Sequence, residues 1–387
     1  MTKIEQLIKE LCPNGVEYKK LSDIATVARG VRVVREQLMV EGEIPVYQNS
    51  LKPLGYNKKA NVKAYSAFVI SAGAAGEIGF SDVDFWAADD CYYFLCPDNL
   101  NNRYLYFVLM KNQPLILSRV RKASIPRLSR TVIENLVIPV PPLEVQAEIV
   151  KILDNFTELT AELTAELTAR KKQYEYYRDL LLDFGAHGGG ASECEWRTLE
   201  SFADVRDGTH DSPKPSDYGY PLVTSKNISG GNLDLTSCYL INENDYNSIN
   251  QRSKVDITDV LVSMIGTIGE NIIVTSEPNY AIKNIGLVKT GNLLTSKYIK
   301  YYISSSYGQR YIQENIKGTA PRYLSLTALR KFSIPVPPIE EQERIVSILD
   351  RFDKLCNDIS EGLPAEIEAR RKQYEYYRDK LLSFNAK

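Results

Sequence analysis

Apolar residues recur at helical spacing along two long stretches of the chain, and the first stretch covers residues 141–184. Its apolar positions are Ile149, Ile152, Phe156, Leu159, Leu163, Leu167, Tyr174, Tyr177 and Leu181. This stripe is narrow, as in a helix that pairs with one partner helix in a coiled coil. The pair Pro141-Pro142 precedes the stripe and suits a helix start. A continuous helix over residues 143–184 would extend about 60 Å, at about 1.5 Å per residue.

The second amphipathic stretch, residues 336–387, carries a similar stripe that Gly362-Leu363-Pro364 interrupts. Because proline kinks or ends a helix, we expect a kink or break at this point. The two long helices most simply bury their stripes against each other in an antiparallel pair, since their polar flanks leave little apolar surface for a third layer. In the alternative arrangement, each stripe packs against its own globular neighbour.

Shorter apolar runs and glycine turns characterise the rest of the chain. Residues 67–71 and 260–264 are typical of strands, and each run enters a glycine-containing turn. We expect tight hairpins at these turns, although such turns also let a backbone approach phosphate. Tyrosine-rich helical runs follow at 104–110 and 298–304, and we expect their rings in the core rather than stacked on bases. The pattern predicts an α+β fold, in which an antiparallel coiled-coil spacer separates two mixed α/β domains.

The chain is a tandem duplication, which gives the predicted fold an internal pseudo-twofold repeat. The matched segments are 138–156 with 334–352, at an offset of 196 residues, and 169–184 with 369–384, at an offset of 200. The second connecting segment is therefore four residues longer, which accommodates the predicted helix break. Between these segments the copies diverge, and weak matches such as Pro126-Arg127 with Pro321-Arg322 remain.

The duplication predicts how the chain is divided into segments. Residues 1–140 and 193–335 form the two variable globular domains. Residues 141–184 form the central spacer helix and 336–387 the C-terminal spacer helix. Residues 185–192 are rich in glycine and have the composition of a flexible linker.

Length and composition place the chain among multidomain globular proteins. Its 387 residues exceed the roughly 100–200 of one domain, and 44% hydrophobic with 25% charged content is average for globular proteins. No apolar run reaches the about 18 residues of a membrane span, and residues 1–11 carry charges that a signal peptide core lacks. We therefore expect a cytoplasmic protein without membrane contact.

Cysteine usage and charge narrow the chemistry further. The six cysteines include no Cys-x-x-Cys pair and the chain has two histidines, so we expect no structural zinc. Cys91 and Cys96 flank a strand-like run and are expected to be buried free thiols. The net charge of −2 divides into +4 for 1–140, −4 for 141–184, 0 for 193–335 and −2 for 336–387. A polyanion would accordingly contact the globular parts.

The sequence contains no common catalytic motif. It lacks the dinucleotide-binding and P-loop glycine patterns, H-E-x-x-H, G-x-S-x-G and the Asn/Asp-Pro-Pro-aromatic motif of amino-methyltransferases. Asp207, His210 and Asp211 form the best metal candidate. A polar turn is favoured there, because no second histidine lies nearby and the opposite segment of the first copy, residues 29–35, is basic. We therefore expect neither a catalytic site nor a bound metal.

Two repeated segments carry a family resemblance that covers essentially the whole chain. At the duplicated Pro-Val-Pro-Pro, Gln146 with Gln342, and Gln-Tyr-Glu-Tyr-Tyr-Arg-Asp, the sequence resembles the specificity (S) subunits of type I restriction-modification systems. Thr-Ala-Glu-Leu at 160–163 and again at 164–167 resembles the tetrapeptide array in the central spacer of one branch of that family. Thr157-Glu158-Leu159 precedes it as a degenerate copy.

The resemblance implies a non-catalytic DNA-binding subunit. In that family two variable target-recognition domains each recognise one half of a split double-stranded DNA sequence. The shared helices form a spacer that also docks two methyltransferase subunits, and motor-nuclease subunits complete the complex. The complex methylates adenine at N6 and restricts DNA with ATP. The S-adenosylmethionine cofactor belongs to the methyltransferase, so no cofactor is expected on this chain, and different domains imply an asymmetric target.

Base recognition is expected from exposed polar and basic side chains on loops of the two domains. In the first domain the candidates are Arg29, Arg32, Arg35, Gln48, Asn49, Lys52, Arg121, Lys122 and Arg127. In the second domain they are His210, Lys214, Ser225, Lys226, Asn227, Lys317 and Arg322. Clustering within 29–35 and 119–130 distinguishes the basic candidates from isolated surface charges.

Three alternative functions remain open at this point. The chain could specify the target of a defence methylase that is not of type I, or it could be a coiled-coil scaffold that does not bind DNA. A fused methyltransferase or nuclease would need a cofactor motif or carboxylate cluster that the sequence lacks.

Overall fold

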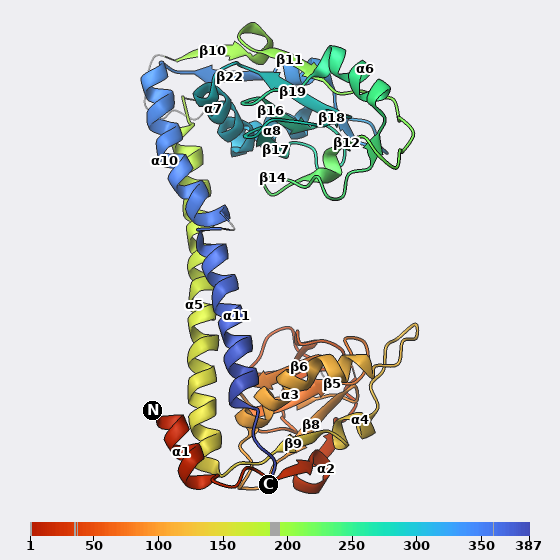
Figure 1. Ribbon diagram of the computed structural model, residues 1–387, viewed down its shortest axis with the longest axis vertical. Helices are drawn as coiled ribbons and strands as arrows, with labels where there is room; N and C mark the ends of the chain where they lie inside the picture. The colour runs from red at the N-terminus through yellow and green to blue at the C-terminus, as the bar shows by residue number, and fades with distance from the viewer. Residues whose placement is uncertain (1, 35, 37, 186–193, 359) are drawn as a thin grey trace. The chain divides into compact units, whose positions relative to one another are not determined.

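The structure is a computed structural model that describes residues 2–34, 36, 38–185, 194–358 and 360–387. The chain divides into two compact units. Unit 1 comprises Met1–Thr164 with Glu366–Lys387, and unit 2 comprises Ala165–Ala365. Each unit contains one mixed α/β domain and segments of two long helices (Figure 1). The predicted linker lies, except for Gly185, outside the described residues.

Unit 1 contains short strands and six helices among its described residues. Its helices are α1 (Lys3–Leu11), α2 (Leu21–Ile24), α3 (Asn102–Ser118), α4 (Arg130–Glu134), the first part of α5 (Leu143–Leu181) and most of α11 (Leu363–Leu381). Its strands are β1 (Tyr18–Lys20), β2 (Thr26–Arg29), β3 (Ile44–Tyr47), β4 (Gly55–Asn57), β5 (Ser66–Ile70), β6 (Ile78–Ser81), β7 (Trp86–Ala87), β8 (Cys91–Leu95) and β9 (Val137–Pro139).

The domain of unit 1 is built around the buried strand β5. An antiparallel sheet has the order β2-β8-β5-β6, and a second sheet has β3 between antiparallel β4 and parallel β7. Every residue of β5 is buried, because α3 covers the sheet on one side and the second sheet's aromatic cluster packs on the other. The Tyr104 ring of α3 is fully buried and its hydroxyl donates to the Pro139 carbonyl, 3.1 Å away. The prediction that this tyrosine belongs to the core is confirmed.

Unit 2 repeats this plan with additional short elements. Its helical elements are the end of α5, η2 (Leu199–Ser201), η3 (Ser225–Asn227), α6 (Glu243–Ser253), α7 (Leu293–Ser304), α8 (Ser306–Asn315), α9 (Leu326–Arg330) and α10 (Ile339–Asn357). The first strands are β10 (Glu195–Thr198), β11 (Asp204–Asp207), β12 (Tyr220–Val223), β13 (Ile228–Ser229), β14 (Asn232–Leu233), β15 (Leu240–Ile241) and β16 (Val260–Ser263). The remaining strands are β17 (Asn271–Ile273), β18 (Ala281–Ile282), β19 (Ile285–Lys289), β20 (Ile316–Lys317), β21 (Tyr323–Leu324) and β22 (Ser333–Val336).

The sheets of unit 2 match those of unit 1 strand by strand. The order β11-β19-β16-β17 is antiparallel, and β12 lies between antiparallel β15 and parallel β18. Tyr298 is buried and its hydroxyl donates to the Pro335 carbonyl at 2.9 Å, as Tyr104 does in unit 1. The predicted hairpins are also confirmed, because β5 pairs with β6 and β16 with β17 across the two glycine turns.

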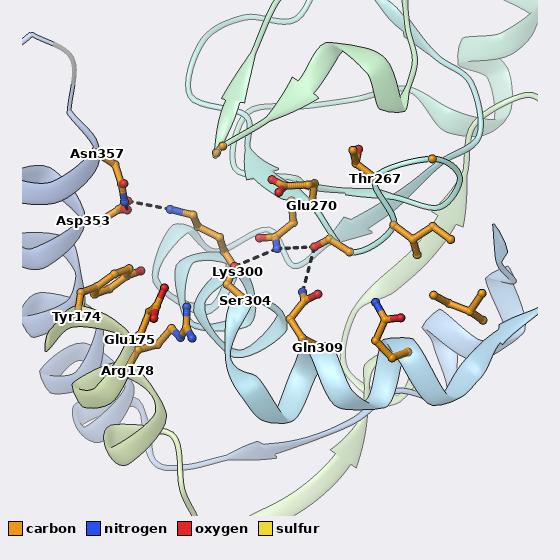
Figure 2. A pocket seen from close by; sticks show the side chains of 18 of the residues that line it. Tyr174, Glu175, Arg178, Thr267, Glu270, Lys300, Ser304, Gln309, Asp353 and Asn357 are labelled. Carbon is orange, nitrogen blue, oxygen red and sulfur yellow. Dashed lines mark hydrogen bonds and ion pairs between the residues drawn. The ribbon is translucent and has the colours of Figure 1, made fainter. Parts of the chain in front are cut away.

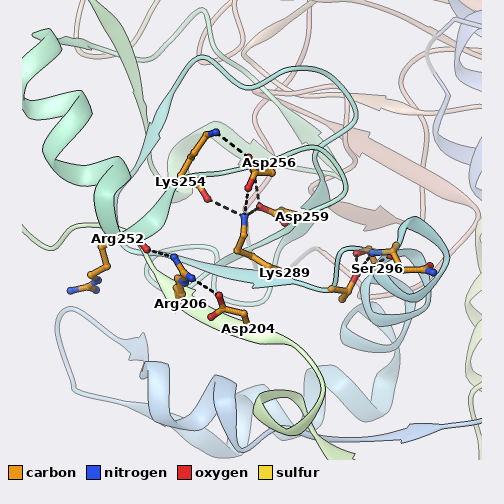
Figure 3. A network of polar contacts seen from close by, with 10 residues as sticks. Asp204, Arg206, Arg252, Lys254, Asp256, Asp259, Lys289 and Ser296 are labelled. Carbon is orange, nitrogen blue, oxygen red and sulfur yellow. Dashed lines mark hydrogen bonds and ion pairs between the residues drawn. The ribbon is translucent and has the colours of Figure 1, made fainter.

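A polar network fixes the segment between α6 and β16 in unit 2 (Figure 3). Lys289 of β19 donates to Asp259 at 2.5 Å, to Asp256 at 2.9 Å and to the Lys254 carbonyl at 3.1 Å. Burial raises the pKa of Asp259, whereas the hydrogen bond from Lys289 lowers the pKa of the more exposed Asp256. Lys289 therefore compensates a buried carboxylate and holds this loop against the sheet.

The long helices pair within each unit, as predicted. In unit 1 the rings of Phe156 in α5 and Tyr377 in α11 stack with centroids 5.3 Å apart. Figure 1 shows α5 beginning and α11 ending at the same end of unit 1, so these segments are antiparallel. In unit 2, Phe352 of α10 stacks on Tyr174 and Tyr177 of α5, at 6.2 and 5.7 Å.

The first turns of both spacer helices correct the simple pairing scheme. Ile149 and Leu153 of α5, like Ile345 and Leu349 of α10, are fully buried in the core of their own domain. The first turns of each stripe thus pack against the domain, and the later turns pack against the other long helix. The expected interruption is confirmed, since α10 ends at Asn357 and α11 begins at Leu363.

Candidate nucleic-acid interface

Four segments of the unit 1 domain meet at one edge of its sheets. They are loop A after β2 (30–34), loop B after β3 (48–54), the β5–β6 turn (71–77) and loop D after α3 (119–128). The Ala74 amide donates to the Asn49 carbonyl at 2.9 Å, and the Gly73 amide donates to the Pro126 carbonyl at 3.1 Å. The β5–β6 turn therefore ties loop B to loop D.

The end of β2, where loop A begins, joins the same edge through the two residues before β8. The Arg29 side chain donates to the Asp89 carbonyl at 2.7 Å, and the Ser71 amide donates to the Asp90 carbonyl at 2.7 Å. Cys91 is buried, which raises its pKa to about 12, and its thiol donates to the Gln48 carbonyl at 3.2 Å. The predicted buried free thiol is thus part of the framework beneath the loops.

The structure brings most of the predicted unit 1 residues to this edge. The residues placed there are Arg29, Arg32, Gln48, Asn49, Lys52, Arg121, Lys122 and Arg127. Gln48 is partly buried and the other seven are exposed. Arg35 lies outside the described residues. Within the part of the chain that the structure describes, none of the basic members forms an ion pair, as basic residues that contact phosphates require.

Loop D projects between α3 and α4 and carries three of these cations (Figure 1). Its base is closed by two backbone hydrogen bonds, from the Arg121 amide to the Arg127 carbonyl at 2.8 Å and back at 3.1 Å. The backbone alone therefore holds this loop, and the exposed side chains of Arg121, Lys122 and Arg127 are left for other contacts.

Unit 2 places four corresponding segments at its own edge. They are loop A (208–216), loop B (224–231), the β16–β17 turn (264–270) and loop D (317–323). The Thr267 hydroxyl donates to the Ser225 carbonyl at 3.3 Å, and the Leu324 amide donates to the Met264 carbonyl at 2.8 Å. Of the predicted residues, His210, Lys214, Lys226, Lys317 and Arg322 are exposed on these loops.

Asn227 and Ser225 differ from what the sequence led us to expect. Asn227 is 5% exposed, and its side-chain oxygen accepts from both the amide and the hydroxyl of Thr224 while its amide donates to Ser237. Ser225 is partly buried at the start of η3. Because its polar atoms are already bound to Thr224 and Ser237, Asn227 shapes loop B and is not one of the proposed DNA contacts.

Loop D also corrects one match made from the sequence. Arg121 pairs with Arg127 in unit 1 as Lys317 pairs with Tyr323 in unit 2. Arg127 therefore corresponds in space to Tyr323, and Arg322 lies one position earlier than the matched Pro-Arg pairs predict. The two loops have equal length between the paired residues, and the Pro-Arg pair simply lies one position earlier in unit 2.

In the Asp207–Asp211 segment, the side chains of Asp207 and His210 are bound to other side chains of the protein. Asp207 is 4% exposed and accepts from Arg252 of α6. His210 Nε2 lies 3.1 Å from the Asp207 carboxylate, and His210 Nδ1 lies 2.8 Å from Asn284 Oδ1. No group of three or more His, Cys, Asp or Glu side chains suited to a metal ion occurs among the described residues.

Sequence reasoning missed Lys283 and Asn284, which complete the unit 2 edge. Lys283 donates to Ser212 of loop A, and Asn284 contacts His210. Both follow β18, which pairs in parallel with β12, and such a non-local pairing leaves no local sequence signal. In unit 1 the two residues directly before β8 are Asp89 and Asp90, so the corresponding connection is acidic.

A cleft of about 730 Å³ opens beside the β16–β17 turn in unit 2 (Figure 2). Its lining has mixed charge, with Glu270 and Asp353 facing it as well as Lys300 and Arg322. Lys300 donates to Asp353 at 2.9 Å, so this cation is already neutralised. The cleft is therefore a weaker polyanion site than the exposed loops next to it.

Comparison with known proteins gives a consistent match over both halves of the chain. Residues 13–170 and 192–369 each match the family described as the type I restriction modification DNA specificity domain. The chain is 33% identical to a putative type I restriction enzyme specificity subunit of Haemophilus influenzae, over 98% of each chain. It is 38% identical to the EcoR124I/EcoR124II specificity subunit of Escherichia coli, over 64% of this chain and 61% of that one.

Solved structures share the fold. The S subunit of a type I restriction-modification system from M. genitalium matches with a TM-score of 0.64 at 16% identity, over 96% of this chain and 97% of that chain. A chain solved for complex assembly and conformational transition of the type I R-M system matches with a TM-score of 0.61 at 16% identity, covering 96% and 98%. Among the described residues, no helix is both long and apolar enough to cross a membrane.

Proposed function

This chain belongs to the family of type I restriction-modification specificity subunits. From that premise we propose which part of the chain performs each function. It is a non-catalytic subunit with two target-recognition domains, and it determines DNA sequence specificity within a complex whose other subunits catalyse. We assign recognition of one half-site to the loop edge of unit 1 and of the other half-site to the edge of unit 2.

One observation carries this assignment: the same four-segment edge is built twice from different side chains. The backbone contacts at the two edges correspond, as in the Leu128 amide to Ser71 carbonyl and Leu324 amide to Met264 carbonyl bonds, both 2.8 Å. The exposed residues on that common framework differ, with arginines at unit 1 and His210, Lys214 and Lys226 at unit 2. Because base contacts determine sequence preference, we infer a split target with two different halves.

The repeated helix segments provide the proposed docking sites for two methyltransferase subunits. Tyr176 of α5 and Tyr376 of α11 lie at matching positions and are 64% and 61% exposed. Lys172 and Lys372, one turn earlier, are also exposed and identical. Identity in an exposed face is not explained by packing, and two copies of the same partner surface explain it. Motor-nuclease subunits would join this assembly in the cytoplasm.

The chemistry of modification is assigned to the partner. We propose that the methyltransferase subunits hold S-adenosylmethionine and transfer its methyl group to adenine N6, with no cofactor on this chain. The role of this chain is to place two such subunits on DNA with its two loop edges. ATP-dependent restriction is likewise assigned to the motor-nuclease subunits.

The test is co-expression of this chain with its neighbouring methyltransferase in a host free of DNA methylation, followed by methylome sequencing. A split asymmetric motif containing N6-methyladenine, absent when either protein is omitted, is the expected result. Methylation by the partner alone, or none with both proteins present in a purified complex, would overturn the proposal. The identity of the partner genes distinguishes a type I system from another defence methylase.

A further inference from the structure

We propose that Arg32 and His210 occupy one matched specificity position, at which the two domains recognise different base pairs. The inference rests on the proposed function and extends it from loop edges to a single pair of side chains. It follows from the way loop A leaves the sheet in each unit.

The glycine that opens loop A is held in the same way in both units. The Gly30 amide donates to the Cys91 carbonyl at 2.9 Å, and the Gly208 amide donates to the Ile285 carbonyl at 2.9 Å. A Cβ at Gly30 would lie 2.1 Å from the Ala88 carbonyl oxygen, and one at Gly208 would lie 2.3 Å from that of Ile282. Only glycine can pass so close to this neighbouring backbone, so loop A starts at the same place in both domains.

In the residue after each glycine, both the backbone amide and the backbone carbonyl form a hydrogen bond. The Val31 amide donates to the Ala87 carbonyl at 2.9 Å, and the Val31 carbonyl accepts from the Trp86 indole at 2.8 Å. In unit 2 the Thr209 amide donates to the Ile282 carbonyl at 3.0 Å, and the Thr209 carbonyl accepts from the Asn284 amide at 3.1 Å. The next residue therefore emerges from a fixed point of the edge, and that residue is exposed Arg32 or His210.

Arg32 presents a free guanidinium at this point. It forms no hydrogen bond or ion pair with any other described residue, whereas the neighbouring Arg29 is bound to the Asp89 carbonyl. A guanidinium fork recognises guanine O6 and N7 with two parallel hydrogen bonds. Arg32 accordingly selects a G·C pair at one position of the first half-site.

His210 presents different chemistry because both of its ring nitrogens are already engaged. Nε2 faces Asp207 and Nδ1 faces Asn284, at 3.1 and 2.8 Å, while 66% of the side chain stays exposed. What remains for a ligand is the carbon edge and the faces of the ring, which suit an apolar contact such as a thymine methyl group. His210 accordingly disfavours recognition of guanine at the matched position.

Asp207 is a positioning residue for this ring. It is buried, and its second oxygen accepts from Arg252, so the carboxylate cannot turn away from His210. If Asp207 acts through His210, Asp207→Asn changes the second half-site preference in the wild-type background but not in a His210→Arg background. A purely structural Asp207 would give the same effect in both backgrounds, since independent effects add.

The experiment is methylome sequencing of the co-expressed complex with Arg32→His and His210→Arg, each serving as the other's control. We expect His210→Arg to gain at least a tenfold preference for guanine at one position of the second half-site, with the first half-site unchanged. Arg32→His should lose a guanine of the first half-site, with the second unchanged. Lys331→Ala, an exposed residue outside the loops, should leave both halves unchanged.

The outcomes separate this inference from the proposed function. A wild-type complex without any split motif would refute the proposed function. A split motif that both variants leave intact, or a first half-site without a G·C pair, would overturn the matched position alone. If either arginine-histidine exchange abolishes methylation, Arg32→Gln and His210→Gln decide by selection from a randomised duplex library, because glutamine pairs with adenine and not with guanine. An unchanged motif overturns the inference.

Discussion

Gln146 and Gln342 occupy the same turn of α5 and α10. Among the described residues, only Gln146 has hydrogen-bond partners for both its side-chain nitrogen and its side-chain oxygen. The Gln146 amide donates to the carbonyls of Pro141 at 2.8 Å and Asn99 at 3.0 Å, and its oxygen accepts from the Asn101 amide at 2.8 Å. Gln342 donates to the Pro337 carbonyl at 2.9 Å, while its buried oxygen has no partner among the described residues. Asn292 corresponds to Asn101, and its backbone amide donates to the Thr290 hydroxyl at 3.1 Å and not to Gln342.

Gln146→Leu should therefore destabilise its unit more than Gln342→Leu destabilises the other. The first substitution leaves one partly buried donor and two carbonyls without their Gln146 partner, and we expect a loss of about 1–3 kcal/mol. The second leaves one carbonyl unpaired but removes an unsatisfied oxygen, and we expect less than about 1 kcal/mol. Hydrogen exchange of α3 and α7 in the full-length chain measures the two effects separately. Equal losses in both units would contradict the prediction.

The features that the sequence predicted correctly are those set by local pattern. The break between α10 and α11, the glycine turn between β16 and β17, and the buried ring of Tyr298 each follow from residues close together in the chain. Helix periodicity likewise identified α5. Such elements depend on spacing and side-chain shape, which a sequence displays directly.

The features that escaped prediction depend on contacts between distant strands. The parallel pairings of β3 with β7 and β12 with β18 bring Asn284 to His210, and neither segment indicates the other. The match of Arg127 with Tyr323 required the cross-strand register, because the Pro-Arg pair lies one position earlier in loop D of unit 2. Asn227 resembled a surface asparagine, and only the fold showed that its side chain is bound to Thr224 and Ser237.

Insertion of one Thr-Ala-Glu-Leu unit into residues 160–167 should widen the gap between the half-sites without changing either half. Four residues lengthen a helix by about 6 Å, close to two base-pair steps of about 3.4 Å. They add about 40° beyond a full turn, so the apolar stripe stays nearly aligned. Methylome sequencing of the insertion variant measures the gap. An insertion of four residues between the exposed Lys58 and Lys59 is the control. An unchanged gap in the spacer variant would refute the prediction.

Neutralising loop D of unit 1 should weaken DNA binding in a salt-dependent way. The triple change of Arg121, Lys122 and Arg127 to alanine keeps the backbone bonds that close the loop. Removing one phosphate-binding cation should reduce the slope of log affinity against log salt by about 1. Titration of labelled duplex at several salt concentrations measures this slope for the purified complex. The matched control replaces Lys9, Lys20 and Lys151, which are exposed elsewhere in unit 1, and an equal effect there would contradict a specific role for loop D.

Tyr176 and Tyr376 should each govern the binding of one methyltransferase subunit. Both rings stand on the outside of their helix, packed edge-on against Tyr177 or Tyr377 at 5.4 and 5.3 Å, so alanine removes an exposed aromatic surface without opening the seam. Native mass spectrometry should find one methyltransferase per chain for either single alanine variant and none for the double variant at concentrations that saturate the wild type. Phenylalanine at both positions keeps the ring and should keep both subunits, because the contact is apolar. Retention of two subunits by the double alanine variant would place the docking surface elsewhere, while the two loop edges could still recognise the split target.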